Sequence, residues 1–459
     1  MISNGAIGSQ IQNTSEVFLL PQRTSQPIEM SPLTVKFTLR TVPSLALRAV
    51  PWLAACVFLS AFPAVAATAV AANLNTVLLE AFTQHPDIRS RRDEQQAAVD
   101  RLDAARWGRF PGLSAEVETR SGGPQSVLRV EQPLWNGGRI SSQIDVSQAE
   151  LSVAGATLSE TQLDILQRSA GAFFDILRLE ARLKTAVSNE AEHLRLLEII
   201  QRRVAAEVSP STDETQAAAR WRQAITERIQ TIRQIDTARL LLAQLVGKPV
   251  AELMPPVRIN MDRWSETTLL EAAMRVSPER QRLVAQVDAA DAQIGLAKSQ
   301  IMPSLVAGYQ SRLGSLPFGE ERNRAYIAVQ VQTGGGLSSL ANVRAAVSRK
   351  TAAIDAIEAH DRRLTQSVRT SWTESQALKE QVEPVRNLLL GSEQIVASYL
   401  RQFQVGRKNW LDVLNAQREK TQAEYSFSDL EYPLMLSSVR LLLLAGSWDP
   451  TTLSLSHAP

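Results

Sequence analysis

The feature that most constrains this chain of 459 residues is an internal duplication. Four landmarks recur in the same order in both halves: Leu-Leu-Glu-Ala at 78–81 and 269–272, prolines at 86 and 111 and at 278 and 303, Gly-Gly at 137–138 and 335–336, and aspartate at 213 and 412. Self-similarity of this kind indicates that one folding unit has been copied. We therefore predict two tandem units, unit 1 at 73–256 and unit 2 at 257–446.

Each unit reads as a helix, a β-hairpin, a very long helix and a medium helix. In unit 1 the first helix is predicted over 74–107, with Pro86 disturbing it locally, and it ends before the proline at 111. Apolar and polar residues then alternate near 113–119 and 127–133, on either side of a turn at Ser121-Gly122-Gly123-Pro124, which predicts two amphipathic strands. Unit 2 shows the same alternation near 305–309 and 327–331.

The next segment, 139–207, contains no proline and only two glycines. A helix of that length would run roughly 100 Å, which is too long for a globular core. Steps of seven from Ile144 to Ile200 meet apolar residues at all positions but His193, as the seam of a coiled assembly requires. We expect His193 to be a hydrogen-bonded or partly exposed seam residue, not a metal ligand. In unit 2 a similar helix is predicted over 337–401, interrupted by Pro384.

The N-terminal residues resemble a secretory leader. A stretch without acidic residues carries Lys36, Arg40 and Arg48, then an apolar run, and then the small-residue cleavage site Ala64-Val65-Ala66. Residues 1–72 are therefore predicted to be an N-terminal extension and a signal peptide. The alternative is a transmembrane anchor, although prolines interrupt the run.

The single cysteine, Cys56, lies inside this leader. Leu53-Ala54-Ala55-Cys56 can be read as a lipidation box, which would anchor the mature chain through an acylated Cys56. Cleavage farther along would instead leave a mature protein without cysteine, and so without disulfides or thiolate metal sites.

Charge and composition argue against two functional classes. Lys plus Arg number 49 and Asp plus Glu number 47, so a net charge of +2 offers no field to attract nucleic acid. The four histidines are scattered, and no nucleophile stands with a base. Gly334-Gly335-Gly336 lies at a strand-to-helix junction but lacks the lysine of a phosphate-binding loop. We predict no enzyme, no catalytic residue, no metal site and no cofactor.

Beyond the leader, no segment has the 18 to 20 apolar residues of a spanning helix. A membrane position would therefore depend on the four strands, whose alternation is equally typical of a soluble sheet. Four strands cannot close a barrel, because about eight is the smallest closed size. Membrane strands would thus require several chains in a symmetric oligomer.

Two segments carry a resemblance to a known family. Gln132-Pro133-Leu134-Trp135-Asn136-Gly137-Gly138-Arg139 and the run from Phe403 to Ala416 resemble signatures of the TolC family of outer-membrane channels. The resemblance implies a mainly α fold with membrane β: a homotrimer whose four strands per chain close a twelve-stranded β-barrel, continued by an α-helical coiled-coil barrel across the periplasm. Residues 447–459 are left as a C-terminal tail.

The resemblance also implies roles at the periplasmic tip. Asp412 matches the first acidic ring of the constriction, and Asn415 stands where a second acid is common. Lys408 matches a basic link residue with Asp213 as its acidic partner, whereas Phe403 lacks the hydroxyl of the matching aromatic. The alternative for these charges is a solvated helix end. Because unit 1 has Glu-Val-Ser-Pro at 207–210, adaptor contacts are expected to favour Val405 and Gly406.

Together these features predict an exit duct in the outer membrane, extending into the periplasm. The duct would serve a tripartite efflux pump or a type I secretion system, passively conducting substrate from an inner-membrane transporter to the outside. Its expected partners are a periplasmic adaptor, that transporter, outer-membrane lipid and two further copies of the chain. The rival hypothesis is a periplasmic coiled-coil scaffold, or the adaptor itself, without a channel. The cargo is left open between a small toxic molecule, a metal ion and a polypeptide.

Overall fold

The computed structural model describes residues 72–120, 123–250, 252–257, 259–314, 321–331, 338–449 and 454–455. The predicted leader, its cleavage site and Cys56 lie outside these residues. So do part of the predicted turn at 121–124 and the glycine run at 334–336. The described helices and strands all belong to the unit formed by residues 67–459.

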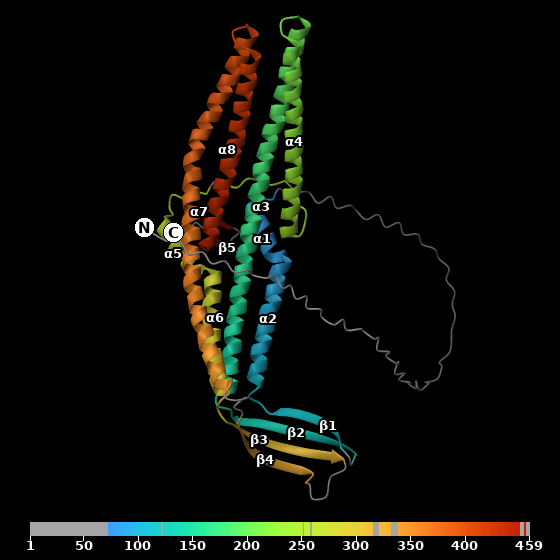
Figure 1. Cartoon of the computed structure of the whole chain (residues 1–459), viewed down its shortest axis with the longest axis vertical. Coiled ribbons are helices and arrows are strands. Elements are labelled where there is room, and N and C mark those ends of the chain that lie inside the picture. Colours follow the sequence, from blue (N-terminus) through green and yellow to red (C-terminus); the bar gives the residue numbers. More distant parts are fainter. Residues whose placement is uncertain are drawn as a thin grey trace, which may run out of the picture. The chain divides into compact units, whose positions relative to one another are not determined.

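The predicted order of elements occurs twice along the chain (Figure 1). Unit 1 contains α1 (Leu74–Gln84), α2 (Pro86–Trp107), β1 (Gly112–Arg120), β2 (Gly123–Trp135), α3 (Arg139–Ala205) and α4 (Ser211–Val246). Unit 2 contains α5 (Glu266–Val276), α6 (Pro278–Ser299), β3 (Ser304–Gly314), β4 (Asn323–Gln330), α7 (Ser338–Gln404) and α8 (Trp410–Leu444). A short pair, β5 (Trp448–Asp449) and β6 (Ser454–Leu455), follows. The boundary between the units at 256 stays a prediction.

Two details of the predicted helices are wrong. The first helix of unit 1 is two helices, because His85 has extended backbone and its ring accepts from the Asp87 N–H at the start of α2. Proline suits the first turn of a helix, where its missing N–H would have no partner, so Pro86 begins α2. The second error concerns Pro384, which does not interrupt the long helix of unit 2: α7 runs through it for 67 residues, the length of α3.

The long helices pack in pairs. α3 runs beside α4, and α7 beside α8, while α3 also contacts α8 and so joins the two units (Figure 1). The largest apolar core lies where α1, α3, α4 and α8 meet, and its fully buried members include Phe173, Phe174 and Leu242. These helices are amphipathic, so packing one face of each against the others removes the apolar stripes from water.

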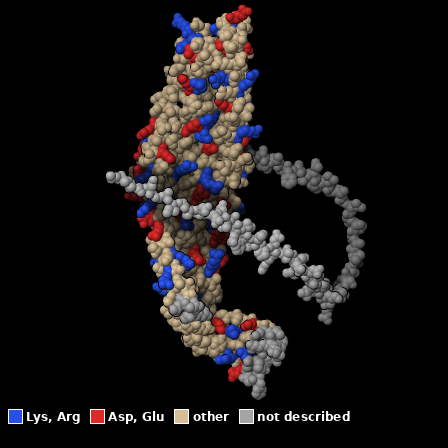
Figure 2. Space-filling view, viewed as in Figure 1, with Lys and Arg blue, Asp and Glu red and all other residues tan. Residues whose placement is uncertain are grey.

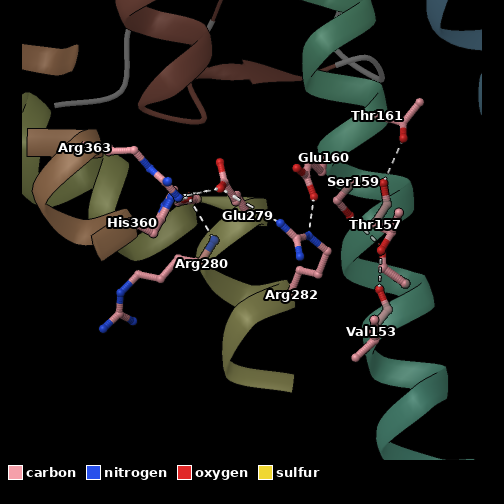
Figure 3. Close-up of polar contacts among 12 residues, drawn as sticks. Val153, Thr157, Ser159, Glu160, Thr161, Glu279, Arg280, Arg282, His360 and Arg363 are labelled. Atoms are coloured by element: carbon pink, nitrogen blue, oxygen red, sulfur yellow. Dashed lines mark hydrogen bonds and ion pairs between the residues drawn. The ribbon is translucent and has the colours of Figure 1, made fainter. Parts of the chain in front are cut away.

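α6 lies between α3 and α7, and its first turns, at the end away from the sheet, are held to both by charged contacts (Figure 3). Arg282 of α6 reaches Glu160 of α3 with Nε and Oε2 2.6 Å apart. On the other side, Glu279 of α6 lies 3.2 Å from Nδ1 of His360, which is buried on α7. In unit 1, by comparison, α2 packs against α3.

The four longer strands form one antiparallel sheet in the order β1-β2-β3-β4. The register places Leu113, Val130 and Tyr309 in one row, and Ala307 pairs with Ile327 on the same face. The opposite face carries polar side chains, and there the Tyr326 hydroxyl donates to Glu131 Oε1 at 2.5 Å. One face is therefore apolar and one polar, as the alternation predicts, and the outer edges of β1 and β4 pair with no other described strand.

No helix in the described ranges combines the length and the apolar character needed to cross a membrane. On the face of the molecule shown in Figure 2, basic and acidic side chains are interspersed along the helices.

Candidate functional site

The two hairpin tips, where α3 turns into α4 and α7 turns into α8, have the same backbone geometry. At the unit 2 tip, the Gly406 N–H donates to Phe403 O at 3.0 Å and the Arg407 N–H donates to Gln402 O at 2.9 Å. At the unit 1 tip, Glu207 and Val208 make the corresponding bonds to Val204 and Arg203, both at 2.9 Å. This is the pattern that closes a helix through one residue in the left-handed region.

The residue in that region differs between the tips. Gly406 has φ of 76°, and Glu207 at the equivalent place has φ of 57°. A left-handed backbone suits glycine and costs other L-residues about 1–2 kcal/mol. The tips are thus more alike than the sequence indicates, and the unit 1 tip carries strain that the unit 2 tip avoids.

We expect Glu207→Gly to stabilise the protein by about 0.5–1 kcal/mol, because relief of the left-handed strain exceeds the added freedom of the unfolded chain. Thermal unfolding followed by circular dichroism would show a small rise in Tm. Gly406→Ala is the matched control and should lower the Tm. A fall in Tm for Glu207→Gly would contradict the role given to this backbone angle.

A small apolar core, here named the tip core, joins both units just behind the tips. Its buried members come from all four long and medium helices: Leu196, Leu197, Ile200, Ala217, Leu400, Phe403, Trp410, Val413 and Leu414. The rings of Phe403 and Trp410 lie 5.5 Å apart, and the Arg203 guanidinium lies 4.6 Å from the Phe403 ring centre. The tips of the two units are therefore held together by packing as well as by charge.

Polar contacts continue this α3–α8 interface away from the tips. Asn189 Oδ1 accepts from the Thr421 hydroxyl at 2.8 Å and from Gln417 Nε2 at 3.2 Å, and all three residues are buried. Farther along, Asp429 accepts from both Arg178 at 3.0 Å and Arg182 at 2.6 Å. Buried polar groups need matched partners, so the contacts of Asn189 align α3 with α8 in one register.

The predicted constriction residues lie at the start of α8. Asp412 is the third residue of that helix, and its N–H donates to the capping Asn409 Oδ1 at 2.9 Å. Asn415 lies one turn further along and is exposed. Asp213 takes the equivalent third place in α4. Each aspartate therefore also lies in the first turn of its helix, where a negative charge interacts favourably with the helix dipole. This position fits the alternative stated above, a solvated helix end.

The predicted link residues are only partly brought together. Lys408 Nζ lies 3.6 Å from Asp412 Oδ2 and 4.3 Å from the ring centre of Tyr399. Within the described part of this single chain, no ion pair joins Lys408 to Asp213. Phe403 is 4% exposed and belongs to the tip core, so it packs rather than stands as an unfilled latch position.

The predicted adaptor contacts are accessible. Val405 is 69% exposed at the unit 2 tip, and Gly406 beside it is exposed. Unit 1 also presents an exposed valine, Val208, at 62%. The structure therefore offers an apolar side chain at both tips, and the expected preference for the unit 2 tip stays a prediction.

The expected hydrogen bond or partial exposure of His193 is not found among the described residues, while the expectation that it is no metal ligand stays a prediction. The residue is 7% exposed, and its Nδ1 has no hydrogen-bond partner among the described residues. Burial, with a smaller contribution from Arg220, lowers the pKa of His193 to about 4, so the ring is neutral at neutral pH. In the part of the chain that the structure describes, no group of three His, Cys, Asp or Glu residues is placed to hold a metal ion.

The duplicated strand-and-helix unit, with one shared sheet and paired helical tips, defines the architectural class of this chain. The family described as "Outer membrane efflux protein" matches residues 77–248 and 269–447. The chain belongs to this family, whose members are outer-membrane channels and not enzymes. Channels of this kind are homotrimeric and work with adaptor proteins and inner-membrane transporters.

Similar proteins share both the sequence pattern and the fold. The cobalt-zinc-cadmium resistance protein CzcC of Cupriavidus metallidurans is 25% identical over 343 residues, 72% of this chain and 81% of its own. The outer membrane protein TolC of Vibrio cholerae is 23% identical over 401 residues, 82% of this chain and 91% of its own. The crystal structure of VceC from Vibrio cholerae superposes with a TM-score of 0.70 at 19% identity, covering 81% of this chain and 96% of that one.

The tip core and the α3–α8 polar contacts are functional candidates that sequence reasoning missed. A weak signal was present, because the seven-residue steps from Ile144 end at Ile200, in the tip core. Nothing in the sequence shows that α8 is the neighbour of α3, since Asn189 and Thr421 are separated by 232 residues.

Proposed function

We propose that this chain is the exit duct of a tripartite efflux pump or a type I secretion system, conducting substrate passively from an inner-membrane transporter to the outside. The observation that carries the proposal is the tip: two helical hairpins of one chain, both with exposed valines, held together by a small core. A core this small stabilises the closed tips only modestly, so the binding free energy of an adaptor that prefers the open tips can exceed that stabilisation. Opening then needs the tip ends of α7 and α8 to move away from those of α3 and α4, while the larger core farther along the helices stays packed.

Two features support three copies around one axis. Among the described strands, the outer edges of β1 and β4 have no partner, and joining such edges between three chains gives twelve strands in a closed barrel. Its apolar face would meet outer-membrane lipid and its polar face would line the duct. The duplication supplies the second feature: α6 fills the space between α3 and α7, so α2 is positioned to fill the same space between α3 and the α7 of the next copy.

The exposed side of α7 fits this assembly. Leu340, Val347 and Ile354 recur at seven-residue steps and are 50%, 47% and 48% exposed in the single chain. An apolar stripe at heptad spacing is suited to a neighbouring helix. We assign the α2 of the next copy to this stripe.

The relatives' names point to different cargoes. CzcC is named for cobalt, zinc and cadmium resistance, and another relative, AprF of Pseudomonas aeruginosa, for alkaline protease secretion. The described residues hold no metal-ligand cluster that would select a cation. We propose that the transporter selects the cargo, while this chain supplies the passage and its gate.

The gate proposal places Asp412 and Asn415 around the constriction and Lys408 at its links. Because Lys408 pairs with Asp412 inside one chain, we assign its link with Asp213 to neighbouring copies. Exposed ion pairs contribute only about 0–1 kcal/mol each, so loss of one should loosen the constriction without unfolding it.

We therefore expect Asp213→Ala and Lys408→Ala each to raise single-channel conductance in planar bilayers. The conductance of the double variant should be only slightly higher than that of the stronger single variant, because each substitution alone already removes the same link. Lys379→Ala, which removes an ion pair with Asp262 away from the tips, is the matched control and should conduct as the native protein does. Unchanged conductance and closure statistics in both single variants would count against the link.

The proposed function is tested by purification and conduction together. An exit duct should require detergent for extraction, run as a heat-sensitive trimer and give single-channel currents. Its deletion should abolish export by the cognate transporter. A monomer recovered from the soluble periplasmic fraction would instead favour the rival hypothesis of a periplasmic scaffold or adaptor.

A further inference from the structure

A polar cleft of about 120 Å³, here named the tip cleft, lies beside the tip core between α3, α4 and α8. This is well above the roughly 10–15 Å³ that a single water needs, so a small polar group fits inside. Its polar lining comes from both units and includes Asn189, His193, Arg220, Glu227, Arg418 and Thr421. The cleft is therefore a place where one ligand could touch both helical pairs at once.

The charges of this lining favour an anion. Arg220 on α4 and Arg418 on α8 both line the cleft, and no carboxylate of the described chain lies within ion-pair distance of either guanidinium. Arg220 donates to Gln223 Oε1 at 3.1 Å. Glu227 is the carboxylate of the lining, and it accepts from Gln223 Nε2 at 3.3 Å. With His193 neutral, two cations face one anion, so the cleft has a net charge of +1.

The buried histidine is an independent sign of a missing partner. His193 is more than nine-tenths buried, lines the cleft and has no hydrogen-bond partner at Nδ1 among the described residues. Buried polar atoms are almost always paired with protein or with a bound group. Nδ1 itself is closed to solvent, so a bound group reaches it only when the ring turns toward the cleft, where the Nδ1–H tautomer donates to an anion.

We propose that the tip cleft is a binding site for a small oxyanion, a phosphate or carboxylate group held between Arg220 and Arg418 and hydrogen-bonded by His193. Guanidinium groups match the paired oxygens of both anions, and charged hydrogen bonds of this kind are strong. The bound anion joins α3 and α4 to α8 and stabilises the closed arrangement of the tips. This effect on the gate rests on the proposed function, whereas binding itself does not.

Binding is measured by thermal unfolding of the full trimer in detergent, with inorganic phosphate replacing chloride at constant ionic strength. The native protein should show a saturable rise in Tm. Arg220→Gln and Arg418→Gln should each weaken the apparent affinity about tenfold or more, because each removes a charged hydrogen bond. Arg222→Gln is the matched control, since Arg222 is exposed on α4 and does not line the cleft.

A parallel series with acetate distinguishes the two sources of the group. A rise in Tm with phosphate but not with acetate would identify a phosphate site. A rise with acetate but not with phosphate would identify a carboxylate site. A Tm that rises equally in all four proteins, or in none, with both anions overturns the proposal. Conductance recorded with and without the binding anion separates the anion site from the proposed function. A protein that binds the anion but passes no current would support the anion site and contradict the exit-duct function.

Discussion

Trp410→Ala should open the constriction and leave the rest of the protein folded. Trp410 begins α8, is 3% exposed, and packs on Phe403 inside the tip core. Removing a buried tryptophan typically costs about 3–5 kcal/mol. A core of nine residues at the free ends of four helices has little else to offset that loss. The two hairpins should therefore separate, and single-channel conductance should rise well above that of the link variants.

Hydrogen exchange localises the expected effect. Backbone amides in 196–217 and 400–414 should exchange faster in Trp410→Ala, while those of the large core around Phe173 keep their protection. Trp107→Ala is the control for loss of a tryptophan, since Trp107 is 68% exposed and far along the chain from the tips.

Trp410→Phe separates packing from hydrogen bonding. The indole Nε1 of Trp410 has no hydrogen-bond partner among the described residues, so phenylalanine keeps most of the ring contact and removes an unpaired buried N–H. We expect near-native conductance. A conductance as high as that of Trp410→Ala would mean that packing against Phe403 is not what holds the tips together.

The sequence predicts the long elements well because their signals are local. Absence of proline, a seven-residue apolar step and a Gly-Gly boundary predicted a helix over 139–207, and α3 covers Arg139–Ala205. The strands follow from alternation, which depends only on the period of the backbone. The error at Pro384 has a physical reason: a proline removes one backbone hydrogen bond, and 67 residues of packed helix tolerate that loss.

The tip was less predictable because its contacts join residues far apart in the chain. From sequence, Phe403 is an aromatic that lacks the hydroxyl of its counterpart, whereas in the structure its ring contacts both Trp410 and Arg203. Lys408 was given Asp213 as a partner by resemblance, and within one chain it contacts Asp412 instead. Periodicity says which face of each helix is apolar. It does not say which helix covers that face.

The duplication makes the trimer testable to the level of one pair of residues. In the single chain, a Cβ built on Gly295 of α6 lies 3.7 Å from the Ser142 Cβ of α3, a separation suited to a disulfide. Asp103 stands as far beyond Pro86 in α2 as Gly295 stands beyond Pro278 in α6. Ala341 stands 65 residues before Gly406 at the unit 2 tip, as Ser142 stands 65 residues before Glu207 at the unit 1 tip.

Asp103→Cys combined with Ala341→Cys should therefore crosslink neighbouring copies in a ring, in a Cys56→Ala background that removes the one native cysteine. Under oxidising conditions, denaturing gels should show a covalent trimer that a reducing agent returns to monomer, and either single cysteine should give none. Both positions are exposed in the single chain, so the substitutions themselves should cost little stability. Each chain contributes one α2 and one α7, so in a closed ring every copy forms two disulfides, one with each neighbour. In a scaffold whose copies associate side by side, the two end copies would each keep one unpaired cysteine. Failure to crosslink in the membrane-extracted protein would mean that α2 does not occupy, in the next copy, the place that α6 holds in this one.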